Sequence, residues 1–191
     1  MQTPRFVDIA DHKALKWQAD FVEAFSAKVL AAKGSANFLL CAAPNSGKTR
    51  AAGFAMSHAA EKFKTDLIIV AVPNCAIKRQ WAAEVAPYGI ALSIEVSNSR
   101  LVRRCGIDTA LDGIVATYAQ ISQMPELYRK LCYSRQAMVC LDEVHHLADE
   151  KAWGAAALQA FEHAKIRLSL SGTPFRCDGQ SIPFQEYQDE S

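Results

Sequence analysis

The chain has 191 residues, half of them apolar, a size that favours a single domain able to bury one sizeable core. Its 21 basic and 20 acidic residues leave a net charge of +1, which excludes the strongly cationic surface used by non-specific nucleic-acid-binding proteins. Any contact with nucleic acid must therefore be local.

The cysteines and the apolar runs indicate where the protein resides. The six cysteines form no CxxC pair, and several lie in apolar runs, as expected of reduced thiols. The first residues lack the apolar core of a signal peptide, and no apolar run approaches the roughly 20 residues that a membrane span needs. We expect a soluble, cytoplasmic protein without membrane contact.

The first predicted element is an amphipathic helix over residues 12–32. Its apolar residues recur at helical spacing, with Asp11 placed to cap its start and Gly34 to end it. After this helix, short apolar runs alternate with helical stretches, which predicts strands of a mostly parallel sheet covered by helices on both faces. The predicted fold class is therefore a three-layer α/β domain, with strands at 37–42, 67–72, 113–118, 137–141 and 166–170.

A phosphate-binding loop is predicted between the first strand and the helical stretch Lys48–Lys62. Ala42–Thr49 is a variant of the GxxxxGKS/T pattern, with alanine in the first glycine position. Such a turn exposes backbone N–H groups at a helix N-terminus, where the helix dipole also favours anions. We expect it to bind ATP through Asn45, Ser46, Gly47, Lys48 and Thr49, with Lys48 on the β- and γ-phosphates and Thr49 on Mg²⁺.

Two residues of this region carry conformational predictions. Asn45 stands where glycine is common in such loops, and asparagine tolerates a positive φ better than other non-glycine residues. Gly53 lies inside the following helix, where we expect it to permit close packing of the helix on the sheet.

Two adjacent carboxylates, Asp142 and Glu143, follow the apolar run 137–141. Neighbouring negative charges at the end of a buried strand are costly unless a cation offsets them. We predict that Asp142 reaches Mg²⁺ and that Glu143 orients and deprotonates the attacking water. A zinc site at His145 and His146 is disfavoured, because structural zinc usually takes four protein ligands and no third histidine lies nearby in the sequence.

Three segments in this order resemble motifs I, II and III of superfamily II helicases and translocases: residues 42–49, 142–146 and 169–176. The closest resemblance is to bacterial and phage DEAD/DEAH-box proteins of the DExH kind, which implies a RecA-like P-loop NTPase domain. Residues 72–74 with Gln80 and Trp81 are similar to motif Ia.

The resemblance implies roles for further residues. Gln18, next to Trp17, is similar to a glutamine that reads adenine, although such a pair on an amphipathic helix more often serves packing, with a solvated amide. Nucleotide state would be coupled to strand binding by His145, Ser171, Gly172 and Thr173. Contacts with nucleic acid, DNA rather than RNA, are implied for Pro73, Asn74, Thr117 and Tyr118. Asn74 would also cap the helix that follows, whose first N–H groups suit a phosphate.

The predicted organisation has three parts. Residues 1–36 hold the N-terminal helix, residues 37–176 form the RecA-like core, and residues 177–191 are a polar tail leading toward a second RecA-like domain that this sequence lacks. An arginine finger from such a partner domain is worth about 10³- to 10⁵-fold in turnover in related enzymes. We therefore expect the chain alone to hydrolyse ATP slowly or not at all.

Two other functions fit parts of the pattern. An ATP-binding regulatory or scaffold module would keep the architecture without turnover. The residues that hydrolysis requires are intact, which argues against such a module: Lys48, Thr49, Asp142 and Glu143. A small-molecule kinase would need no second domain, but the segment 169–176 after the acidic pair disfavours it. The predicted function is the N-terminal motor domain of a nucleic-acid-dependent ATPase.

Overall fold

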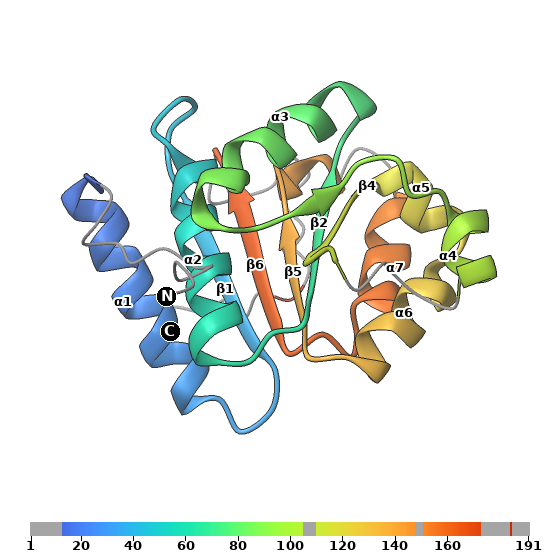
Figure 1. Ribbon diagram of the computed structural model, residues 1–191, viewed down its shortest axis with the longest axis horizontal. Coiled ribbons are helices and arrows are strands. Elements are labelled where there is room, and N and C mark those ends of the chain that lie inside the picture. Colours follow the sequence, from blue (N-terminus) through green and yellow to red (C-terminus); the bar gives the residue numbers. More distant parts are fainter. Residues whose placement is uncertain (1–12, 105–109, 148–150, 173–183, 185–191) are drawn as a thin grey trace, which may run out of the picture.

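The computed structural model describes residues 13–104, 110–147, 151–172 and 184, which are coloured in Figure 1. Within this part of the chain six strands form one sheet in the order β1-β6-β5-β2-β4-β3, and all neighbours pair in parallel. The strands are β1 (Ala36–Cys41), β2 (Leu67–Val72), β3 (Leu92–Ser93), β4 (Gly113–Thr117), β5 (Ala137–Leu141) and β6 (Ile166–Ser171).

Helices cover both faces of the sheet (Figure 1). One layer holds α1 (Lys16–Ala31), α2 (Lys48–Lys62), α3 (Cys75–Val85) and the short 3₁₀ helix η2 (Ala86–Tyr88). The other layer holds α4 (Asn98–Arg104), α5 (Tyr118–Gln123), α6 (Pro125–Ser134), the 3₁₀ helix η3 (Val144–Leu147) and α7 (Lys151–Ala160). The predicted three-layer α/β fold is confirmed. No helix of the described segments is both long and apolar enough to cross a membrane.

Strand β2 shows why the central runs are apolar throughout. All six of its residues are buried. Ile68, Val70 and Val72 pack into the core under α1–α3, while the alternate residues pack into the core under α4–α7. A strand covered on both faces has no polar side, so its sequence cannot alternate. All five predicted strands are present within one residue of the predicted bounds. The two-residue β3 was not predicted, because it is too short to show a period.

The start of α1 differs from the prediction. The helix begins at Lys16 instead of residue 12, with Leu15 as its N-cap. The Leu15 backbone N–H donates to Gln18 Oε1 at 3.0 Å, so a side chain within the first turn satisfies this N–H. Asp11, the predicted cap, lies outside the described residues. At the other end the helix stops at Ala31 with Ala32 as its C-cap, so Gly34 does not terminate it as predicted.

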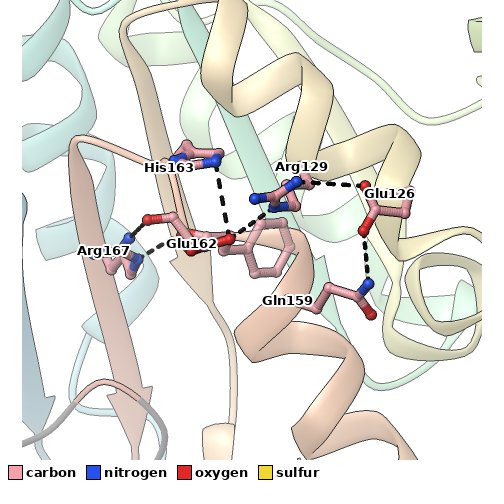
Figure 2. Close-up of polar contacts among 7 residues, drawn as sticks. Glu126, Arg129, Gln159, Glu162, His163 and Arg167 are labelled. Carbon is pink, nitrogen blue, oxygen red and sulfur yellow. Dashed lines mark hydrogen bonds and ion pairs between the residues drawn. The ribbon is translucent and has the colours of Figure 1, made fainter.

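Charged side chains link α6 to the end of α7 (Figure 2). Arg129 Nε lies 2.7 Å from Glu162 Oε2, and Gln159 donates to Glu126 at 2.7 Å. These groups are exposed, and surface pairs of this kind add little to stability. Arg167 of β6 is only 4% exposed, and its guanidinium donates to the backbone carbonyls of Phe161 and Glu162 and to Asn37 Oδ1. It therefore ties the turn after α7 to strand β1.

Gly53 is needed for a different reason from the one predicted. A Cβ at this position would lie 2.5 Å from Cδ2 of the Tyr88 ring, so the close neighbour is η2 and not the sheet. Tyr88 is itself held edge-on against Phe54, with ring centroids 4.7 Å apart. The glycine leaves room for this aromatic pair on the surface of α2.

This packing predicts the effect of Gly53→Ala. Alanine favours a helix by up to about 1 kcal/mol over glycine, whereas overpacking a core costs about 1–3 kcal/mol. We expect a net loss of free energy of unfolding on the order of 1 kcal/mol, measured by urea denaturation. Gly34→Ala is the matched control, since a Cβ there meets nothing within 4 Å. A Gly53→Ala variant more stable than wild type would contradict this packing.

Candidate functional site

The predicted phosphate loop lies between β1 and α2, as its pattern requires. Asn45 has a φ of 60° and Gly47 a φ of 92°, so two residues of the loop are in the left-handed region. The expectation that Asn45 would adopt a positive φ is confirmed. The positive φ of Gly47 favours glycine, and a Cβ there would lie 2.8 Å from Gln18 Nε2, so a larger residue would also have to displace the Gln18 amide. The turn is closed by a hydrogen bond from the Ser46 N–H to Ala43 O, 3.2 Å long.

Lys48 is folded back against its own loop. Its Nζ donates to Ala42 O at 2.8 Å and lies 3.7 Å from Glu143 Oε1. The residue is 8% exposed, so its ammonium group is largely withdrawn from solvent. The loop and the acidic pair, which are far apart in the sequence, therefore lie within ion-pair distance in the fold, as one common site requires.

Asp142 is held from three directions at the end of β5. Its backbone N–H donates to Ala71 O at 2.9 Å, its backbone carbonyl accepts from Tyr118 Oη at 2.8 Å, and its Oδ2 accepts from Trp81 Nε1 at 2.7 Å. Burial raises the pKa of this carboxyl above its ordinary value, although the indole bond opposes the shift. These hydrogen bonds fix the position of the carboxylate, but burying its negative charge costs electrostatic free energy.

Glu143 connects the acidic turn to the end of β6. Its φ is 46°, a left-handed conformation that is costly for a non-glycine residue. His145 Nδ1 lies 3.4 Å from Glu143 Oε2 and 3.4 Å from Ser171 Oγ. The histidine thus links the acidic motif, residues 142–146, to the motif at residues 169–176. The phosphate loop contacts the latter, because the Ala42 N–H donates to Ser171 O at 3.1 Å.

Of the other residues predicted to couple nucleotide state to strand binding, the structure describes Gly172 but not Thr173. A Cβ at Gly172 would lie 4.0 Å from Lys48 Nζ, so the backbone after β6 passes close to the lysine. Thr173 lies outside the described residues. A coupling role for any of these residues remains a prediction.

Gln18 lies against the phosphate loop. Its Nε2 donates to Gly47 O at 3.2 Å, its Oε1 accepts from the Leu15 N–H, and the residue is fully buried. Both ends of the amide therefore support the backbone of α1 and the loop. Reading of adenine by Gln18 remains a prediction.

The residues predicted to touch nucleic acid fall into two groups. Asn74 is exposed and caps α3, accepting from the Ala76 and Ile77 N–H groups at 3.0 and 3.3 Å, so its predicted cap is confirmed. Pro73 beside it is partly exposed. Thr117 instead caps α5, and Tyr118 is 1% exposed with its hydroxyl on Asp142. A contact between nucleic acid and any of the four remains a prediction.

Comparison with known proteins identifies the family. Residues 11–176 match the family described as type III restriction enzyme, res subunit. The chain belongs to this family. The matched range contains both the phosphate loop and the acidic pair, and the res subunit family is of the superfamily II helicase type. The predicted resemblance is therefore confirmed, and the chain is an N-terminal RecA-like domain of that superfamily.

Relatives of the res subunit domain include two uncharacterized mycobacterial proteins. One, from Mycobacterium tuberculosis, is 39% identical over 158 residues, which cover 81% of this chain and 25% of that protein. The other, from Mycobacterium leprae, is 38% identical over 151 residues, covering 79% of this chain and 25% of that protein. The chain spans about a quarter of the length of these relatives.

Solved structures share the fold of this res subunit domain. The Sulfolobus solfataricus SWI2/SNF2 ATPase core in complex with dsDNA superposes with a TM-score of 0.64 at 19% identity, covering 88% of this chain and 34% of that one. The UvsW helicase from bacteriophage T4 gives 0.58 at 15% identity, with coverage of 83% and 52%. The type ISP restriction-modification enzyme LlaGI gives 0.62 at 16% identity, with coverage of 94% and 19%.

The left-handed turn in the loop predicts opposite effects for two substitutions of Asn45. Valine is β-branched and pays about 1–2 kcal/mol for a left-handed conformation, whereas glycine adopts it without strain. We expect Asn45→Val to lower the free energy of unfolding by this amount and Asn45→Gly to change it by less than about 0.5 kcal/mol, both measured by urea denaturation without nucleotide. Equal midpoints for the two variants would contradict a strained Asn45.

Proposed function

We propose that this domain binds ATP with Mg²⁺ and serves as the first motor domain of a nucleic-acid-dependent ATPase, a helicase or translocase. The observation that carries the proposal is the convergence of Lys48 and Glu143, 3.7 Å apart, from segments that lie about a hundred residues apart. The family supports ATP as the nucleotide. The ATPase activity, the binding of nucleic acid and the second RecA-like domain are parts of the proposal.

The loop fits a triphosphate. Gly47 ends the turn and α2 begins at Lys48, so the N–H groups of the first turn face the region where phosphates would bind. In the described part of the chain the buried Ser46 Oγ has no hydrogen-bond partner, and Glu143 Oε2 has no hydrogen bond beside its 3.4 Å ion-pair contact with His145 Nδ1, which suits a site completed by a ligand. When nucleotide binds, the Lys48 ammonium would leave the neutral Ala42 carbonyl and donate to charged phosphate oxygens, which are stronger hydrogen-bond acceptors.

The donor set fits Mg²⁺. This ion is commonly held by one or two protein oxygens together with phosphates, and Thr49 and Asp142 offer a hydroxyl and a carboxylate for that purpose. When bound, Mg²⁺ would neutralise charge that develops on the phosphates. Its presence would also offset the cost of the buried Asp142 carboxylate, whose pKa is raised by burial.

Glu143 is the proposed general base. Its carboxylate lies beside the Lys48 ammonium, where it would orient a water for attack on the γ-phosphate and accept its proton. We propose that His145, bridging Glu143 and Ser171, transmits the nucleotide state to the segment Gly172–Thr173 and onward to a second RecA-like domain. That domain would supply an arginine finger.

The proposed nucleic-acid contact is the start of α3. Pro73 and Asn74 are partly or fully exposed there, and a helix N-terminus attracts a phosphate without added positive charge. This explains how a domain with a net charge of +1 could follow a nucleic-acid backbone. Solved relatives in complex with DNA favour DNA over RNA. We propose that Thr117 and Tyr118 act behind this surface, the latter by holding Asp142.

Glu143→Gln tests the proposed base. Glutamine keeps the size of the side chain but cannot accept a proton, so hydrolysis should fall by about 10²- to 10⁴-fold. We expect the variant of this chain to bind a fluorescent ATP analogue as well as wild type does, and hydrolysis to be lost in a protein that joins this domain to a second RecA-like domain. Retained full turnover would remove Glu143 from this role.

Lys48→Ala is the companion variant, because it removes the phosphate ligand and should abolish nucleotide binding itself. Hydrolysis by the two-domain protein is then compared with and without single-stranded and duplex DNA or RNA. Stimulation supports a motor, whereas nucleotide binding with low activity that no nucleic acid changes would indicate a regulatory module instead.

A further inference from the structure

The indole of Trp81 makes a buried hydrogen bond to the proposed metal ligand. Trp81 lies in the middle of α3 and is 1% exposed. Its Nε1 donates to Asp142 Oδ2 across 2.7 Å, at the short end of the range for an N–H donor and a charged oxygen. The two residues are 61 positions apart, so only the tertiary fold brings them together.

This bond limits the orientations open to the Asp142 carboxylate. The backbone on both sides of the side chain is already fixed by Ala71 O and by Tyr118 Oη. With Oδ2 committed to the indole, the carboxylate cannot rotate about χ2 without breaking a buried hydrogen bond. The direction of its second oxygen is thereby set as well.

A stabilising role alone does not account for this choice of residue. An apolar side chain at position 81 would fill the same core, where Trp81 packs among the residues under α1–α3. The indole adds one donor, and that donor is used on the carboxylate that the proposed function assigns to Mg²⁺. When a group that hydrogen-bonds to a metal ligand is removed, the affinity for the metal commonly falls by about 10- to 100-fold.

We infer that Trp81 is a positioning residue of the nucleotide site, whose indole N–H holds Asp142 in the orientation that receives the metal–nucleotide complex. This inference rests on the proposed function, since it presumes that Asp142 serves Mg²⁺. It adds α3, which begins at the proposed nucleic-acid contact, to the elements that shape the metal site.

The test is Trp81→Phe, which keeps an aromatic ring but removes the donor. Binding of a fluorescent ADP analogue is measured at increasing Mg²⁺ and also in EDTA. We expect the Mg²⁺ concentration at half-saturation to rise by about 10-fold or more, while the affinity in EDTA stays within about twofold of wild type. Circular dichroism and urea denaturation verify that the variant is folded.

Tyr128→Phe is the matched control. It also deletes a buried donor, the Tyr128 hydroxyl that donates to Asn98 Oδ1 at 2.8 Å, but this hydroxyl belongs to a separate network with Gln120. We expect the Mg²⁺ dependence of this control to equal that of wild type. An equal rise in both variants would show a general loss of packing and would overturn the positioning role.

A second measurement needs no change at position 81. The chain has three tryptophans, so a ¹⁵N–¹H spectrum contains three indole signals, which Trp17→Phe and Trp153→Phe assign by elimination. We expect the Trp81 signal to be protected from solvent exchange and to shift on addition of Mg²⁺ to the ADP-bound chain by more than the Trp17 signal does. An unshifted Trp81 signal overturns the inference even if Trp81→Phe fails to fold.

The outcomes separate this inference from the proposed function. If wild type binds nucleotide with a clear Mg²⁺ dependence and Trp81→Phe behaves identically, the role of Trp81 is wrong and the proposed function stands. If wild type shows no nucleotide binding that depends on Lys48, the proposed function fails and the role of Trp81 fails with it.

Discussion

The parallel register of β1, β6 and β5 brings the candidate site together. Cys41 pairs with Ser171, and Leu141 pairs with Ser169, so the three strands end near one another at the same edge of the sheet. Each strand is followed at that edge by one segment of the candidate site: the predicted phosphate loop, the acidic pair and Gly172. Because parallel strands all point their carboxyl ends the same way, no further device is needed to gather segments distant in sequence.

Both buried charge and backbone strain, which are unfavourable for folding, are concentrated at this edge of the sheet. Asp142 is largely buried, Glu143 adopts a left-handed backbone, and Lys48 is withdrawn from solvent against a carbonyl. Each of these features is unfavourable by itself, and the protein offsets them with hydrogen bonds from Trp81 and Tyr118 and with the nearby opposite charge of Lys48. Strain and desolvation at one place, held by a well-packed core, are consistent with the proposed preorganised site for charged phosphates.

The helix layers contribute differently to the site. On one face, α1 supports the phosphate loop through Gln18, and α3 supports the acidic strand through Trp81. On the other face, Tyr118 at the start of α5 reaches the Asp142 carbonyl. The site is therefore braced from both sides of the sheet. Helix α3 also has Asn74 as its exposed N-cap, so one rigid element joins a surface position to Asp142, the proposed metal ligand.

The sequence by itself determined five of the six described strands, the helix after the phosphate loop and the family. Local patterns were sufficient for these, because apolar runs, the loop spacing and the Asn45 turn depend on neighbouring residues. It did not determine the start of α1, where Leu15 is the N-cap and its N–H donates to the Gln18 side chain, or the neighbour of Gly53, which is a ring from η2. The hydrogen bonds that Trp81, Tyr118 and Gln18 make to the site were likewise missed, although a buried indole or phenol usually has a hydrogen-bond partner. Only the tertiary structure decided these contacts, because a hydrogen bond between residues far apart in the chain has no spacing that the sequence can display.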